Sequence, residues 1–484
     1  MRQIEQLDIR RIRWHYIHTR KRSPWYVFSI FLGFSAQTVN MDGFRYWIRR
    51  SGEIDDRVVV DERDWEMMRR RLLRKLKLEP GFLLKQMRNS YRVHDELRRY
   101  CQSIFRRKKL STLTNIELAE LVDGFLWRIQ EAAAYGLLPL FVETELSNYI
   151  AGELKRFSGD FEEKYSLVMT PVKTGRVMQE KMSLLRLAKR YRQGGLVAIK
   201  KDLQKHVEKF SWMKNAGYFT RFVSEGEYLR RLRQVAKQNP DQAIVSLLAE
   251  RRLHARQYRL LLKKVRHNAR LKITIETMNE AIFFRSFRSE EYFRTSIYLT
   301  GLLKAVAQRI NLDHYEDVLY LFPSEVSKLL RKNAAADPRL IRRRKQSYAL
   351  ISDGENYFTC AGDKAVELGA IIRQREISSK KLSGQSAFPG IVQGLVVIVL
   401  SHHDFRKVKS GSILIARSTQ PDYVSVLKKA SAVVTEEGGV LSHASVIARE
   451  MRIPTLIGTK AATQVLKDGD RVEVDATHGT VKKL

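Results

Sequence analysis

The chain changes character at a polar segment, Ser378 to Gly384. Ahead of it the sequence reads mostly helical, with few prolines and long stretches rich in Leu, Arg, Lys and Glu. Behind it, short runs rich in Val and Ile alternate with glycines and short helical patterns, which is typical of an α/β domain. We therefore expect a multidomain chain with a mostly α-helical N-terminal region, a linker at 378–384 and a C-terminal α/β domain at 385–484.

Helical periodicity is clearest in the middle of the chain, and we divide the helical part into regions 1–220 and 221–377. Thr114 to Glu117 forms a capping box, and apolar residues follow it on one helical face. A second helical stretch, Glu227 to Lys264, is interrupted near Asn239-Pro240-Asp241, where Asp241 could cap a new helix. A third runs from about Ile273 to Ile310.

The net charge of +35 is the strongest compositional signal. Residues 384–484 hold 13 Lys and Arg against 9 Asp and Glu, so nearly all of the excess lies in residues 1–383. Basic runs such as Arg342 to Lys345 could bind nucleic acid or could be solvated helix faces. Because the runs are scattered and lack a zinc-finger or helix-turn-helix pattern, we favour solvated faces. The electrostatic field of these basic residues still attracts anionic partners.

Several classes of protein fit the composition poorly. Cys101 and Cys360 form neither a CxxC motif nor a disulfide framework, which indicates a reducing, cytoplasmic location. His15 and His18 share a spacing suited to one helix face but have no accompanying ligand set, so we predict no metal site. The apolar run Trp25 to Ala36 is too short to span a bilayer and predicts a buried strand or helix.

Five short runs in the C-terminal part predict strands separated by helices and tight turns. They are Gly390 to Leu400, Ile413 to Ala416, Ala432 to Val434, Thr455 to Ile457, and Arg471 to Asp475.

His443 follows the third of these strands. Gly438-Gly439 breaks the strand, and Ala444 and Ala448 then recur at helical spacing, so His443 falls in the first turn of a predicted helix. Backbone amides and the helix dipole favour an anion there and disfavour a protonated ring. A neutral imidazole is the nucleophilic form. The alternative is a histidine that merely caps or packs at the helix start.

The C-terminal part resembles the phosphohistidine, or swivelling, domain of phosphoenolpyruvate-utilising enzymes. The matching motifs cover residues 385–484 almost end to end. They comprise Phe388-Pro389-Gly390, Gly411 to Ala416, Thr419 to Asp422, the His443 segment, Ile453 to Gly458, and Asp468 to Asp475 with Gly479. The resemblance implies a compact β/β/α swivelling domain. A weaker resemblance to the helical region that precedes this domain covers Glu316 to Glu325, within 221–377.

The same resemblance implies a set of site residues. His443 would be the nucleophile that carries a phosphoryl group. Supporting residues would be Gly438, Gly439, Ser442 and Thr435, and secondary candidates are Thr419, Asp422 and Arg449. The secondary residues and Thr435 could equally be turn, cap or domain-contact residues, and Arg449 does not share a helix face with His443. Leu441 stands where many family members have threonine, which removes one hydroxyl.

Complete members of the family carry an ATP-grasp domain, but this chain shows no Gly-rich phosphate loop. We therefore expect no cofactor bound by the chain itself, with ATP and Mg²⁺ supplied through a separate ATP-grasp protein. The acceptor would be an anionic or hydroxyl-bearing small molecule. Two other interpretations stay open: a non-catalytic regulatory protein that keeps the swivelling domain, and a basic nucleic-acid-associated protein.

Overall fold

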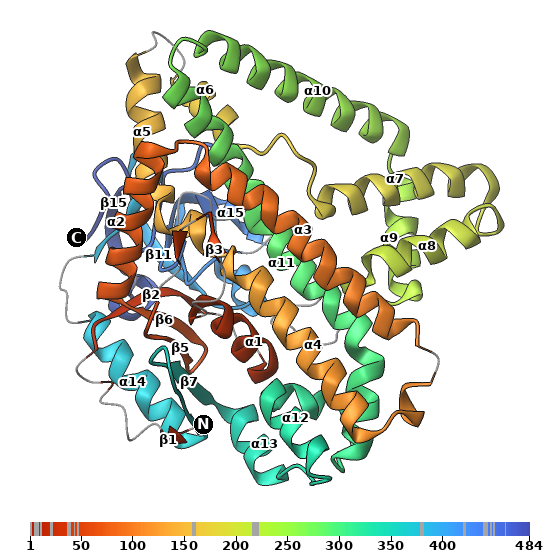
Figure 1. Cartoon of the computed structure of the whole chain (residues 1–484). Helices are drawn as coiled ribbons and strands as arrows, with labels where there is room; N and C mark the ends of the chain where they lie inside the picture. Colours follow the sequence, from red (N-terminus) through yellow and green to blue (C-terminus); the bar gives the residue numbers. More distant parts are fainter. Residues whose placement is uncertain are drawn as a thin grey trace.

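The computed structural model describes the chain apart from residues 1, 4–8, 10–11, 20–22, 36–39, 43, 46–47, 108, 157–160, 215–221, 378–381, 420–422, 439–443, 446–447, 449–450 and 460. Long helices make up most of the chain up to residue 377, and a separate sheet forms the C-terminal part (Figure 1). The coarse expectation of a helical region followed by an α/β region is confirmed.

Three long helices form the centre of the helical region: α3 (Phe82–Phe105), α4 (Asn115–Ala134) and α11 (Ala269–Arg309). They run side by side (Figure 1), and their apolar faces share one hydrophobic core. The predicted capping box starts α4, since Thr114 accepts from the Glu117 amide and Glu117 accepts from the Thr114 amide. The apolar run near Trp25 is α1 (Pro24–Ser35), with Trp25 fully buried.

Shorter helices surround this centre. They are α2 (Glu62–Leu78), α5 (Glu143–Arg156), α6 (Phe161–Met169), α7 (Arg176–Gly194), α8 (Lys200–Phe210), α9 (Glu225–Lys237), α10 (Pro240–Lys264), α12 (Pro323–Arg331), α13 (Pro338–Gln346) and α14 (Asp363–Ile377). The break before α10 occurs where expected, but its cap is Asn239, whose side chain accepts from the Gln242 amide. Asp241 already lies inside the helix, because Pro240 occupies the first turn.

A six-stranded sheet in the helical region was not expected. Its order is β1-β8-β7-β5-β6-β2, built from β1 (Arg2–Gln3), β2 (Trp14–Thr19), β5 (Ser51–Ile54), β6 (Arg57–Asp61), β7 (Tyr348–Ser352) and β8 (Tyr357–Ala361). A separate small hairpin joins β3 (Asn40–Met41) and β4 (Phe44–Arg45). The expectation that His15 and His18 share a helix face is wrong, because both lie on β2. His15 stacks on Trp65, with ring centroids 4.3 Å apart.

The six-stranded sheet contains strands from both predicted regions, 1–220 and 221–377. Strand β5 pairs antiparallel with β7, so Ser51 lies opposite Ser352. The main core likewise runs from Trp25 to Leu350. A second core, between Leu184 and Val235, belongs to α7, α8 and α9 and spans the proposed division. Regions 1–220 and 221–377 are therefore interleaved rather than consecutive in the packing.

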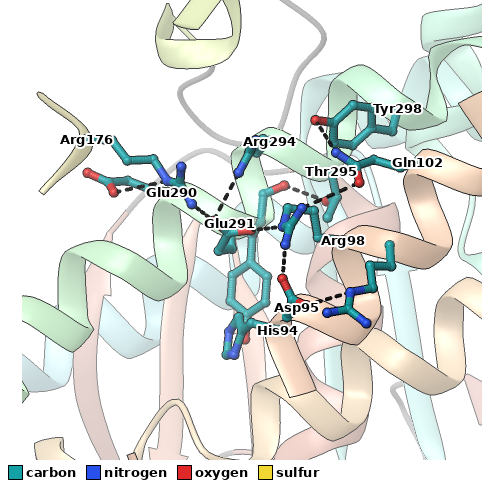
Figure 2. A network of polar contacts seen from close by, with 12 residues as sticks. His94, Asp95, Arg98, Gln102, Arg176, Glu290, Glu291, Arg294, Thr295 and Tyr298 are labelled. Carbon is teal, nitrogen blue, oxygen red and sulfur yellow. Dashed lines mark hydrogen bonds and ion pairs between the residues drawn. The ribbon is translucent and has the colours of Figure 1, made fainter. Parts of the chain in front are cut away.

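Much of the charge in the helical region is paired internally. Figure 2 shows Glu291 of α11, only 2% exposed, among three guanidinium groups. Arg176 at the start of α7 contacts its carboxylate directly, while Arg98 and Arg294 lie 3.7 and 3.6 Å from it. Burial also raises the pKa of the neighbouring Glu290 to about 7, although Arg176 opposes the shift. The network ties α3, α7 and α11 together.

The basic run Arg342 to Lys345 is not wholly a solvated face. Arg344 is buried and makes two hydrogen bonds, of 2.6 and 2.8 Å, to the carboxylate of Glu325. Its guanidinium also lies 4.1 Å from the centroid of the Phe322 ring. This residue therefore fastens α13 to the start of α12, whereas Arg342 is exposed as expected.

The C-terminal part is an eight-stranded sheet of order β10-β14-β13-β12-β11-β15-β16-β9. Its strands are β9 (Leu382–Ser383), β10 (Gln385–Phe388), β11 (Ile391–Val399), β12 (Ser412–Ala416), β13 (Ala430–Thr435), β14 (Thr455–Ile457), β15 (Arg471–Asp475) and β16 (Thr480–Lys483). All five predicted strands are present. The short helices α15 (Val424–Leu427) and α17 (Ala462–Val465) lie between them. Four neighbouring strands, β11, β12, β13 and β14, run parallel.

Candidate functional site

The candidate site lies at the carboxyl edge of the parallel strands in the C-terminal sheet. The ends of β11, β12 and β13 are aligned, since Val399 pairs with Ala416 and Ala416 pairs with Thr435. Parallel strands bring the segments that follow them to one edge of a sheet, where ligands of open α/β sheets usually bind. Thr419 follows β12, Gly438 follows β13 and Thr459 follows β14.

Backbone hydrogen bonds join these three segments. The amide of Glu436 donates to the Ala416 carbonyl at 3.0 Å, and the amide of Glu437 donates to the Arg417 carbonyl at 2.8 Å. The Thr459 amide and hydroxyl both donate to the Thr435 carbonyl, at 3.0 and 2.9 Å. The loop after β13 is therefore held on both sides by its neighbours.

Thr435 serves this loop rather than an open site. Its side chain is fully buried, and its hydroxyl donates to the Glu437 carbonyl at 2.6 Å. A hydroxyl used in this way cannot also face a bound phosphoryl group. This hydrogen bond fits the interpretation of Thr435 as a turn residue, and its predicted role at the phosphoryl site stays a prediction. Thr419 is also buried, at 7% exposure.

Glu436 also lies at this sheet edge and was not among the predicted residues. Its side chain is 3% exposed, and Oε1 accepts from both the amide and the hydroxyl of Thr463, at 2.8 and 2.6 Å. Thr463 lies in the first turn of α17, where a carboxylate is favoured by unpaired amides and the helix dipole. The sequence feature that could have identified Glu436 is its position as an acidic residue directly after a predicted buried strand.

Gly438 has a conformation that other residues rarely adopt, with φ of +119°. It also lies close to Gly458, where an added Cβ would sit 3.3 Å from the Gly438 carbonyl oxygen. Gly458 itself has φ of +71°. Two glycines from neighbouring strand ends thus let the backbones approach closely, as expected for a glycine at this position.

The remaining predicted residues lie outside the described part of the chain. These are Asp422, Gly439, Ser442, His443 and Arg449. The residue directly after His443 is described: Ala444 is 5% exposed and packs with Ala387 and Ile457. Ile457 is the last residue of β14. The described residues on both sides of His443, Gly438 and Ala444, are therefore fixed near the same sheet edge.

His478 does not contribute to the candidate site. His478 lies in the turn after β15, where its Nδ1 is 2.8 Å from Asp475 Oδ2 and helps to lower the pKa of that carboxyl. Within the described residues, no group of three or more His, Cys, Asp and Glu side chains is arranged to hold a metal ion. No described helix combines the length and apolar character needed to cross a bilayer.

The sequence of this edge matches a known domain family. Residues 408–479 match the family described as PEP-utilising enzyme, mobile domain. This range contains β12, β13, β14 and His443, so the predicted family resemblance of the C-terminal part is confirmed.

Individual relatives show how far the sequence similarity extends. A probable phosphoenolpyruvate synthase of Pyrococcus horikoshii is 48% identical over 102 residues, which are 21% of this chain and 12% of that protein. The uncharacterized phosphotransferase YvkC of Bacillus subtilis is 30% identical over 194 residues, or 39% of this chain and 23% of that protein. A rifampicin phosphotransferase of Bacillus cereus is 29% identical over 194 residues, or 40% of this chain and 22% of that protein.

The matched part of this chain is thus similar to proteins named phosphoenolpyruvate synthase and phosphotransferase. The chain spans less than a quarter of the length of each relative. An alignment of 194 residues cannot fit within 385–484, so similarity to the two phosphotransferases extends upstream of the mobile domain.

Proposed function

We propose that this chain is a phosphotransfer protein in which His443 carries a phosphoryl group between an ATP-binding partner and an acceptor. The observation that carries the proposal is the family match over 408–479, which includes His443. The described geometry supports it, because Gly438 and Ala444, which flank the histidine segment in sequence, both lie near the carboxyl edge of the parallel strands.

The chemistry follows from the imidazole ring. A neutral ring nitrogen attacks phosphorus in a nucleotide-derived phosphoryl group, so that a P–N bond forms while the P–O bond to the leaving group breaks. In the second step an oxygen of the acceptor attacks phosphorus, the P–N bond breaks, and the acceptor releases its proton. Gly439 and Ser442 would shape the site around the phosphoryl group, and Asp422 and Arg449 are secondary candidates for its support.

The phosphate would come from another protein. Because the sequence offers no Gly-rich phosphate loop, we place ATP and Mg²⁺ on an ATP-grasp partner that acts in trans. The acceptor would be an anionic or hydroxyl-bearing small molecule, and the relatives named phosphoenolpyruvate synthase and rifampicin phosphotransferase suggest these two classes. Both cysteines are unpaired, which supports a cytoplasmic location for the reaction.

A labelling experiment tests the proposal. The full chain is mixed with candidate ATP-grasp proteins and with ATP labelled in turn at the β- and γ-phosphorus. Wild type should acquire acid-labile, alkali-stable label, His443→Ala should acquire none, and His478→Ala should label like wild type. Equal labelling of wild type and His443→Ala would refute the assignment of His443 as the carrier.

A further inference from the structure

A cleft of about 840 Å³ lies between α7, α8 and α10 in the helical region. Figure 1 shows these helices, with α9, extending to one side of the bundle formed by α3, α4 and α11. The volume falls within the range of roughly 300 to 1,000 Å³ typical of small-molecule sites. The described residues of the candidate phosphohistidine site, Thr419, Thr435 and Gly438, do not line this cleft.

Each of the three helices presents one face to the cleft. The lining residues recur three and four positions apart along each helix, as at Met182, Arg186 and Arg190 of α7. Residues at this spacing lie on the same helix face. The cleft is therefore lined mainly by one face of each helix, with Val172 and Thr174 added from the segment ahead of α7.

The lining carries a strong excess of positive charge. Its basic residues are Arg186, Arg190, Lys205, Lys209, Arg251 and Arg252. Of the described lining residues, only Asp202 carries a carboxylate, and Arg190 pairs with it directly. Among the described residues, Arg186, Lys209 and Arg252 have no carboxylate within ion-pair distance. Unpaired guanidinium groups on facing helices, α7 and α10, suit a multiply charged anion.

The deeper lining is apolar and includes one buried polar ring. Leu187 and Phe210 are buried, and Met182 lies beside them in the lining. His206 is 2% exposed, and its Nδ1 lies 2.8 Å from the Ser183 hydroxyl oxygen. Its Nε2 has no hydrogen-bond partner among the described residues, since the Glu180 carboxylate oxygen is 3.8 Å away.

The cleft wall is anchored to the rest of the protein. Arg176, the first residue of α7, binds the Glu291 carboxylate of α11 and lies 3.9 Å from that of Glu290 (Figure 2). On the opposite wall, Arg251 of α10 donates to the Val172 carbonyl at 2.6 Å, just ahead of α7. The two walls are thus held in place without a ligand, which reduces the cost of ordering them on binding.

We propose that this cleft binds a phosphorylated small molecule with an apolar or aromatic body. Phosphate oxygens would pair with Arg186 and Arg252 at the rim, and the body would lie over Met182 and Phe210. The proposal goes beyond phosphotransfer at His443, and binding in the cleft does not require that histidine.

Fluorescence titration with N-methylanthraniloyl-ADP, which joins two phosphates to aromatic rings, tests the proposal on the full chain. We expect saturable binding that inorganic pyrophosphate reverses, and much weaker binding of the uncharged N-methylanthraniloyl-adenosine. Arg186→Ala and Arg252→Ala should each weaken binding by about tenfold, the effect of losing one charge-assisted hydrogen bond. Arg233→Ala is the matched control, since it removes the same charge from an exposed position on α9.

Two outcomes would contradict binding in the cleft. If Arg233→Ala weakens binding as much as Arg186→Ala, the net charge of the chain attracts the probe and the cleft is not its site. If neither cleft variant changes the affinity while circular dichroism shows an intact fold, the proposal is also wrong. His443→Ala should bind the probe like wild type, so this test can succeed even if His443 carries no phosphate.

Discussion

Glu436 and Thr463 join the loop after β13 to the start of α17. One carboxylate oxygen of Glu436 lies 2.8 Å from the Thr463 amide nitrogen and 2.6 Å from its hydroxyl oxygen. Glu436 is buried and Thr463 is partly exposed, and their hydrogen bonds restrain the loop that leads into the histidine segment.

Removing the Glu436 carboxylate should therefore loosen the site. Hydrogen bonds to a charged group contribute about 1.5 to 3 kcal/mol, so Glu436→Ala should destabilise the C-terminal domain by about 2 kcal/mol, and Glu436→Gln by less. None of the six tryptophans lies beyond residue 212, so hydrogen exchange of peptides covering β13 and β14 is the suitable measurement. Unchanged protection in Glu436→Ala would contradict this role.

The hydroxyl of Thr435 should matter for stability in the same loop. Thr435→Val keeps the shape of the side chain but leaves the Glu437 carbonyl without its donor, at a cost of about 1 to 3 kcal/mol. Thr435→Ser retains the hydroxyl and should cost clearly less. Hydrogen exchange near residues 430–437 would rank the two variants, and a larger loss in Thr435→Ser would contradict the turn assignment.

Arg344 should contribute more to folding stability than the other residues of the basic run Arg342 to Lys345. Arg344→Met leaves the Glu325 carboxylate, which is 22% exposed, without its partner. Breaking a buried pair costs about 3 to 5 kcal/mol, and partial exposure of Glu325 reduces the expected loss to about 2 to 3 kcal/mol. Urea unfolding followed by tryptophan fluorescence measures this loss. The exposed neighbour serves as control, since Arg342→Met should change stability by less than about 0.5 kcal/mol.

Glu290 should make stability depend on pH. Its folded pKa of about 7 lies above the ordinary value of 4.5, so the folded state binds more protons between these values and stability falls as pH rises through this window. Glu290→Gln mimics the neutral carboxyl and should be more stable than wild type at pH 8, by on the order of 1 to 3 kcal/mol. The difference should shrink toward pH 5. Urea unfolding of both proteins at each pH would show it, and a constant difference would disprove the titration.

The C-terminal strands could be predicted because each is a short β-branched run bounded by glycine or polar residues. Positions such as Ile413 and Val434 are buried on a parallel sheet and need little context to be recognised. The N-terminal sheet could not be predicted in this way. Strand β5 depends on β7, nearly three hundred residues later, and local periodicity carries no information about such pairing.

The predicted site residues that the structure describes, Thr419, Thr435 and Gly438, all lie at the carboxyl edge of the parallel strands. The glycine at 438 could be identified because a break after a strand requires it, and its φ of +119° agrees. Thr435 and Glu436 look alike in sequence as polar residues after a strand, and only the hydrogen bonds distinguish the roles of their side chains. The basic cleft was missed because its charges come from three helices that look like solvated faces when read singly.

The most direct test of phosphoryl transfer to His443 is to map the phosphorylated residue. The full chain is incubated with an ATP-grasp partner and ATP, digested at alkaline pH, and analysed by mass spectrometry for one added phosphoryl group on the peptide that contains His443. We predict modification of that peptide at His443, reversed by brief acid treatment. A phosphoryl group confined to another residue, or an acid-stable one on Ser442, would contradict the account.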